Sequence, residues 1–178
     1  MPQPHHLVNI LTGVKSAQEM KDPKLLAQII KKATRPLLII GAQALEQEIG
    51  GRSFIEYLAE IAQAARIPIC ATAHTKKRLL EMGITPESSY DLIEVINALK
   101  DPRWQGVKGE GGHDLVIFGG VRTDLGNQGL SALKHFAPHL KTMTLCKYYF
   151  PHAAFSLPNY RKDEEWRLFL EGLIQELR

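Results

Sequence analysis

Short runs of branched apolar residues recur along the chain, and most of them end on glycine or on small polar residues. The two strongest runs cover residues 36–41 and 114–120, and two weaker ones cover residues 67–72 and 141–146. None of the strong runs has a polar face. This pattern is typical of strands in a parallel sheet that helices cover on both sides.

Segments with apolar residues at helical spacing separate these runs. The spacing predicts six helices. One begins at Asp22-Pro23, two cover residues 54–65 and 76–82, and one follows a cap at Ser88-Ser89. The last two run from about Gln128 to Ala137 and along the end of the chain, where apolar residues from Trp166 to Leu177 lie on one side. Residues 16–20 are expected to form a short helix or turn, and the glycine-rich residues 101–113 an irregular loop. Because strands alternate with helices, we expect an α/β fold: one three-layer domain over residues 1–178, with a central parallel sheet of about six strands and residues 1–20 as an extension.

Charge and composition narrow the class of protein. The net charge of +3, from 22 basic and 19 acidic side chains, is too small to predict nucleic-acid binding. The sequence has no apolar stretch long enough to span a membrane, and residues 1–6 lack the features of a signal peptide. We therefore expect a cytoplasmic protein that binds neither nucleic acid nor membrane.

The chain has two cysteines, Cys70 and Cys146, and each lies at the end of a predicted strand. Neighbouring strand ends would allow a disulfide or a shared metal ion. The simpler interpretation is two small buried residues. Because the sequence has no Cys-x-x-Cys pair, we expect no zinc or iron–sulfur site in this chain.

Ligands of open parallel sheets bind outside the carboxyl ends of the strands, where the strand order reverses. Small residues there expose backbone N–H groups to a phosphate, and an arginine can pair with it. The candidate residues for binding a nucleotide cofactor are therefore Gly41, Ala42, Gln43, Thr72, His74, Gly119, Gly120 and Arg122. No catalytic residue is assigned, although His74 would be a general base if an acid oriented it.

The same residues also allow a simpler interpretation. Glycines end strands in most α/β proteins, Arg122 could pair with an acid, and His74 could be polar surface. Neither of the two specific phosphate-binding glycine motifs is present. In the same way, residues 76–78 (Lys-Lys-Arg) could meet an acidic partner or form a solvated helix face. Lys147, Trp104 and the aromatic residues 148–150 could anchor an interface or fill the local core.

Several of these segments resemble known families. Residues 31–41, the helix after them, residues 66–72 and residues 114–119 resemble the middle domain of thiamine-diphosphate enzymes, in a group with deoxyhypusine synthase and the sirtuins. That resemblance implies a parallel sheet that binds NAD or FAD at its carboxyl edge, or no ligand. The Gly-Ala-Gly start of sirtuins is absent, because Gln43 stands at its third position. The zinc cysteines of sirtuins are also absent from the sequence.

As a whole, the chain resembles the epsilon subunit of the archaeal acetyl-CoA decarbonylase/synthase complex, through its Arg-Pro-Leu-Leu-Ile-Ile-Gly strand (35–41) and residues 148–152 (Tyr-Tyr-Phe-Pro-His). The resemblance implies a non-catalytic accessory subunit in the one-carbon metabolism of methanogens. It would join the large (alpha) subunit of carbon monoxide dehydrogenase in an α2ε2 assembly, self-associate within it, stabilise it and assist electron transfer to FAD. The alternatives are a free-standing nucleotide-dependent enzyme and a module that only holds FAD or NAD.

Overall fold

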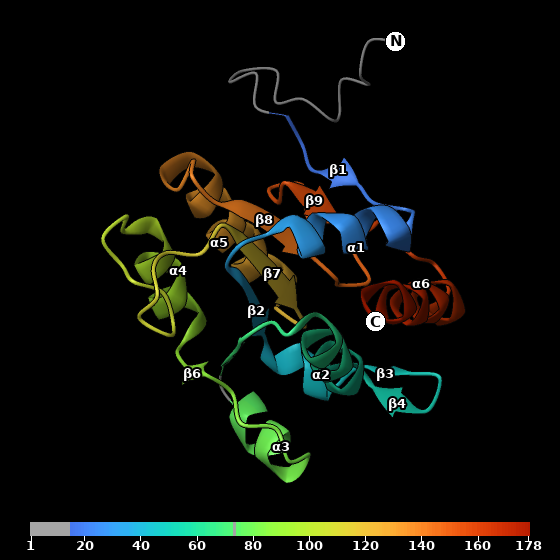
Figure 1. The fold of residues 1–178 in the computed structure, drawn as a ribbon. Helices are drawn as coiled ribbons and strands as arrows, with labels where there is room; N and C mark the ends of the chain where they lie inside the picture. The colour runs from blue at the N-terminus through green and yellow to red at the C-terminus, as the bar shows by residue number, and fades with distance from the viewer. Residues whose placement is uncertain (1–14, 73) are drawn as a thin grey trace.

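The computed structural model describes residues 15–72 and 74–178 (Figure 1). Its main sheet has seven strands in the order β1-β9-β8-β7-β2-β5-β6, and every neighbouring pair is parallel. The strands are β1 (Gln18–Glu19), β2 (Pro36–Ile40), β5 (Ile69–Ala71), β6 (Ser88–Ser89), β7 (Leu115–Gly119), β8 (Lys141–Thr144) and β9 (Phe155–Ser156). The predicted α/β class and central parallel sheet are confirmed, with one strand more than expected.

Helices cover both faces of this sheet and make the fold three-layered (Figure 1). One face packs against α1, α2 and α6, and the other against α4 and α5. The helices are α1 (Pro23–Lys32), α2 (Phe54–Ala65), α3 (Thr75–Glu81), α4 (Leu92–Lys100), α5 (Thr123–Phe136) and α6 (Asp163–Leu177), with a short 3-10 helix η2 (Ala42–Leu45) after β2. A separate hairpin pairs β3 (Glu48–Ile49) with β4 (Arg52–Ser53).

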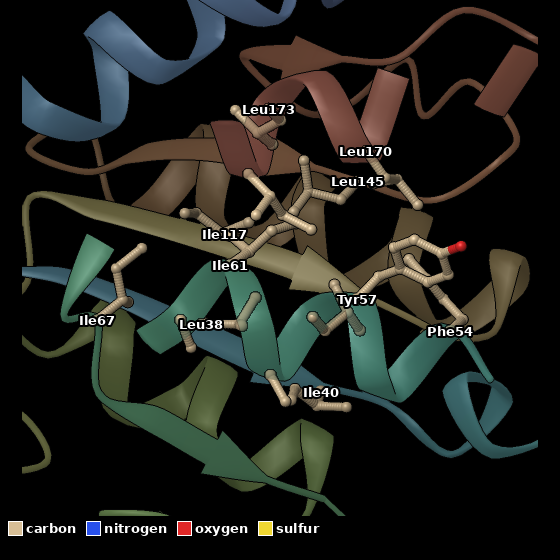
Figure 2. Close-up of a cluster of buried hydrophobic side chains, with 14 of the residues drawn as sticks. Leu38, Ile40, Phe54, Tyr57, Ile61, Ile67, Ile117, Leu145, Leu170 and Leu173 are labelled. Atoms are coloured by element: carbon tan, nitrogen blue, oxygen red, sulfur yellow. The ribbon is translucent and has the colours of Figure 1, made fainter. Parts of the chain in front are cut away.

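The apolar runs without a polar face are strands that are buried on both sides. In β2, Leu38 and Ile40 point into the core beneath α2 and α6, which Figure 2 shows, and Leu37 and Ile39 point into the core beneath α4 and α5. All four side chains have 0% exposure. This placement explains the sequence pattern, because a strand with helices on both faces has no solvent-facing position.

Local chemistry fixes the ends of two helices. At the start of α1, the Asp22 carboxylate accepts a hydrogen bond of 2.9 Å from the Lys24 backbone N–H, and Pro23 follows it. At the start of α4, Asp91 and Glu94 form a capping box. Each cap satisfies backbone donors that have no partner inside the helix.

Three local predictions were wrong. Residues 16–20 contain strand β1, because the Ala17 and Gln18 N–H groups donate to carbonyls of the loop before β9. Ser88 and Ser89 form β6 beside β5, so they do not cap α4. Helix α5 begins at Thr123 and not near residue 128, with two glycines inside its first two turns.

Those glycines allow α5 to lie close to its neighbours. A Cβ at Gly129 would lie 2.2 Å from Ile96 on α4, and one at Gly126 would lie 2.8 Å from Phe150. Close packing therefore outweighs the low helix propensity of glycine. Within the described ranges, no helix combines the length and the apolar character that crossing a membrane requires.

The two cysteines are free and buried. Cys70 lies in β5 and Cys146 follows β8, so two strands, β2 and β7, separate them. The alternative of a disulfide or shared metal ion between them is therefore wrong. Burial raises the pKa of both thiols, that of Cys146 to about 11.

Candidate functional site

The strand order reverses between β2 and β7, at the centre of the sheet. From β2 the chain moves through α2 to β5 on one side, and from β7 it moves through α5 to β8 on the other side. Because parallel strands end at the same edge, the segment after β2 (41–43) lies beside the end of β7 and the residue that follows it (119–120). The structure thus brings together five of the predicted residues at the point where open sheets bind ligands.

The two segments are in direct contact, and backbone bonds hold them together. The Gly41 N–H donates to the Gly119 carbonyl at 2.8 Å, and the Gln43 N–H donates to the Gly120 carbonyl at 2.9 Å. Helix η2 therefore lies over the crevice between β2 and β7. Two of the N–H groups that a phosphate could use, those of Gly41 and Gln43, are therefore already engaged by the protein.

Glycine is required here by this close approach. A Cβ on Gly41 would lie 2.4 Å from the Gly120 carbonyl oxygen, and a Cβ on Gly120, whose φ is +65°, would lie 2.4 Å from the Cβ of Ala44. Any side chain at either position would overlap backbone atoms of the facing segment. These two glycines allow backbone to meet backbone.

Cys146 lies beside further backbone donors at this edge. Burial raises the pKa of its thiol, and the backbone N–H groups of Val121 and Gly120 partly offset this increase. Sequence reasoning missed this role, because it depends on the contact between the β8 end and the loop after β7. The only available signal was that Cys146 comes at the end of a predicted strand.

Thr72 lies at the end of β5, and its hydroxyl donates to the Ile40 carbonyl at 2.9 Å. The next helix repeats this pattern, because the buried Thr75 hydroxyl donates to the Thr72 carbonyl at 2.6 Å. Both hydroxyls therefore satisfy backbone carbonyls at the ends of β2 and β5. Thr75 was not predicted from the sequence.

Arg122 and His74 lie outside this cluster of contacts. Arg122 pairs with Asp124 at 2.5 Å at the start of α5, and both side chains are more than half exposed. This hydrogen-bonded pair raises the pKa of Arg122 and lowers that of Asp124. His74 is exposed just before α3, on a surface that also carries Lys76, Lys77 and Leu80. The simpler interpretation of Arg122, a pair with an acid, is confirmed.

Most of the predicted loop aromatics pack locally. Phe150 is 1% exposed, the Tyr149 hydroxyl donates to the Ala17 carbonyl at 2.7 Å, and Trp104 packs edge-on to Tyr90. Only Tyr148 points outward, with half of its side chain exposed.

Lys147 beside that loop is fixed by an ion pair of 2.7 Å with Asp163 at the start of α6. Among the described residues, no group of three or more His, Cys, Asp or Glu side chains is arranged to hold a metal ion.

Comparison with known proteins decides the family. The model of the family described as CO dehydrogenase beta subunit/acetyl-CoA synthase epsilon subunit matches residues 1–174. The chain belongs to this epsilon subunit family. Relatives support the assignment over nearly the whole length.

An acetyl-CoA decarbonylase/synthase complex subunit epsilon of Methanothermobacter thermautotrophicus is 42% identical over 167 residues, which cover 94% of this chain and 92% of the relative. Epsilon 1 subunits of Archaeoglobus fulgidus and Methanosarcina barkeri are 41% and 34% identical, covering 80% and 93% of this chain and 75% and 92% of the relatives.

The resemblance implies FAD binding, which would require free backbone donors for the FAD pyrophosphate. An FAD pyrophosphate at the strand-order reversal would need the N–H groups of the segments after β2 and β7. In this conformation those of Gly41 and Gln43 donate to carbonyls of the protein itself. A pyrophosphate that used these two donors would require the contacts to open, and FAD binding stays a prediction.

Proposed function

We propose that this chain is a non-catalytic accessory subunit of an acetyl-CoA decarbonylase/synthase complex, where it binds and stabilises the large subunit of carbon monoxide dehydrogenase. The observation that carries the proposal is the family match over residues 1–174, together with relatives that are named epsilon subunits of such complexes. The assembly proposed is α2ε2, with equal numbers of the two chains. Self-association of the epsilon chains would then occur within that assembly.

The chemistry of the carboxyl edge supports a binding role. The polar groups where an α/β enzyme would hold its substrate are used to join the ends of β2, β5 and β7 to one another. Hydroxyl and N–H groups that satisfy backbone carbonyls stabilise the fold. They are not positioned to move a proton of a substrate.

A reconstitution experiment tests this proposal. Purified large subunit is mixed with this chain, and three quantities are measured: co-migration in gel filtration, the melting temperature of the large subunit, and its rate of flavin reduction. Co-migration with a raised melting temperature is expected. A faster flavin reduction would add the electron-transfer role that the resemblance implies. No association, with stability and flavin reduction unchanged, would contradict the proposal.

The second candidate is a free-standing FAD- or NAD-binding protein or nucleotide-dependent enzyme. The reversal of the strand order between β2 and β7 favours it, because dinucleotides bind at such points. Calorimetric titration of FAD, NAD and NADP into the isolated chain separates the two candidates. We expect no binding to the isolated chain, because the contacts between Gly41, Gln43 and the loop after β7 fill the crevice.

A further inference from the structure

A cavity lies at the opposite, amino edge of the sheet, where no candidate residue was predicted. It has a volume of about 170 Å³ and lies between the segments that enter β2 and β5 and the glycine-rich loop of residues 105–112. The charged groups on its walls are Arg35, Arg66, Lys108 and Glu110. Lys108 is already paired with the Glu87 carboxylate at 3.3 Å, so Arg35 and Arg66 are the cationic groups that face the one carboxylate of the lining, Glu110.

The loop that closes this cavity is built around His113. The Val107 N–H donates to Nε2 of His113 at 3.2 Å, so this nitrogen is an acceptor, and Nδ1 carries the proton that it donates to the Arg35 carbonyl at 3.0 Å. His113 is 8% exposed and packs against Trp104. Both ring nitrogens are engaged, so His113 shapes the wall and has no free position for a ligand.

The same loop fixes the guanidinium of Arg35. Its Nε donates to the Gly112 carbonyl at 2.6 Å, which leaves the two terminal nitrogens without a protein acceptor among the described residues. Gly111 has a φ of +113°, and a Cβ there would lie 3.2 Å from the guanidinium carbon. Glycine is favoured here by the φ, and a larger residue would also displace the end of the Arg35 side chain.

The pairing of arginines sets this cavity apart from the rest of the surface. Most arginines of the described chain form ion pairs with carboxylates: Arg52, Arg78, Arg103, Arg122, Arg167 and Arg178. Among the described residues, Arg35, Arg66 and Arg161 have no such pair. Two of these three line the cavity.

Arg66 also occupies an unfavourable backbone conformation. It caps the carboxyl end of α2 with a φ of 54°, and it is the one non-glycine residue with positive φ in the described ranges. Glycine is the usual residue at such a cap, because it adopts this conformation without strain. An arginine at a position that favours glycine leads to the hypothesis that its side chain has a use.

We propose that this cavity binds a small oxyanion, a phosphate or a carboxylate group, between the guanidinium groups of Arg35 and Arg66, with Lys108 nearby. Guanidinium groups bind both kinds of oxyanion through paired N–H donors. The volume is below the range of about 300–1,000 Å³ that is usual for drug-sized ligands, so one such group fits and a whole dinucleotide does not. Glu110 and the carboxyl end of α2 oppose the anion, and the guanidinium groups of Arg35 and Arg66 outweigh them, whereas Lys108 is shared with Glu87.

Calorimetric titration of the full chain tests this site. Inorganic phosphate and acetate are titrated separately, in chloride buffer of constant ionic strength. Saturable binding of one anion per chain is expected. Binding of phosphate alone, of acetate alone, or of both would each support an oxyanion site and would identify the group that it prefers.

Variants make the test specific to the cavity. Arg66→Gly removes one guanidinium and relieves the unfavourable φ, so the variant should fold with an equal or higher melting temperature and bind the anion about tenfold or more weakly. Arg35→Gln should weaken binding to a similar degree. Arg161→Gln removes an unpaired arginine outside the cavity and should leave binding unchanged. Absence of saturable binding, or equal binding by Arg66→Gly and the unaltered chain, would overturn the proposal.

Discussion

At the scale of single residues, two glycines with positive φ differ in whether they also need the missing side chain. Gly120 has a φ of +65° and lies against Ala44 of η2, whereas Gly83 has a similar φ of +74° and no atom near the place of its absent Cβ. Both need the conformational freedom of glycine. Only Gly120 also needs the missing side chain, because the segment after β2 occupies that space.

Substitution by alanine should separate these two needs. Gly83→Ala should lower the free energy of unfolding by about 1 kcal/mol, the cost of the backbone conformation. Gly120→Ala should lower it by about 2–4 kcal/mol, because the new Cβ also overlaps the Ala44 backbone. Urea unfolding measures both values, and equal losses would show that the segments after β2 and β7 are not in contact.

A second prediction at this scale concerns pH. Burial lowers the pKa of His113, so the folded chain favours the neutral imidazole that accepts from the Val107 N–H. The unfolded chain binds this proton more readily. The stability that His113 contributes is therefore complete above its unfolded pKa of about 6.5 and is lost as the pH falls through the lower folded pKa.

The measurement is the urea midpoint between pH 7.5 and pH 5. The unaltered chain should lose stability over this interval more steeply than His113→Gln does. His139→Gln alters an exposed histidine and should keep the steep dependence. If His113→Gln shows the same dependence of stability on pH as the unaltered chain, the prediction that His113 is buried in its neutral form is wrong.

At the scale of elements, the sequence predicted what depends on burial and missed what depends on pairing at the edges of the sheet. Strands β2 and β7 and helix α2 were predicted from apolar pattern alone, since each is buried along most of its length. Strands β1, β6 and β9 have two residues each, and their pairing partners are distant in sequence. No local pattern marks such strands.

For the candidate site, the sequence predicted the location but not the contacts that its backbone groups make. The chain order placed Gly41–Gln43 beside Gly119–Gly120, and strand ends alone were enough to predict this edge. What engages their N–H groups could not be predicted. The Gly41 and Gln43 N–H groups bond to carbonyls of Gly119 and Gly120, so these bonds depend on β2 and β7 being neighbours in the sheet.

The cap of α4 gives a prediction at the element scale. Asp91→Ala removes the carboxylate that accepts from the Ile93 N–H at 3.1 Å and should lower the free energy of unfolding by about 1 kcal/mol. Ser89→Ala changes an exposed residue of β6 that does not cap the helix, and should change stability by less than about 0.5 kcal/mol. Urea unfolding compares the two. A larger loss for Ser89→Ala would indicate that the serines, as the sequence first suggested, cap the helix.

At the scale of the whole molecule, the two edges of the sheet differ in what they present. At the carboxyl edge, backbone and hydroxyl groups bind one another, and the loop after β8 exposes Tyr148. At the amino edge lie the end of α5, with Phe136 70% exposed, and the cavity between Arg35 and Arg66. An exposed tyrosine in a loop is a favoured anchor of protein interfaces.

This difference predicts which edge meets the large subunit. If the subunit docks through the loop after β8, Tyr148→Ala should weaken the binding of purified large subunit by about 30-fold, the effect of an interface hot spot. The melting temperature of the isolated chain should stay unchanged, because Tyr148 is half exposed. Phe136→Ser, at the opposite edge, should bind as the unaltered chain does. The reverse ranking in surface plasmon resonance would move the interface to the amino edge.

The central claim is that this epsilon-family chain works as a subunit of a larger enzyme. Native affinity purification of the chain from the cells that produce it, with quantitative mass spectrometry of the proteins recovered, tests this most directly. The account predicts recovery of the large subunit of carbon monoxide dehydrogenase in an amount equal to that of the chain. Recovery of the chain without that subunit would contradict the account and favour a free-standing nucleotide-binding protein.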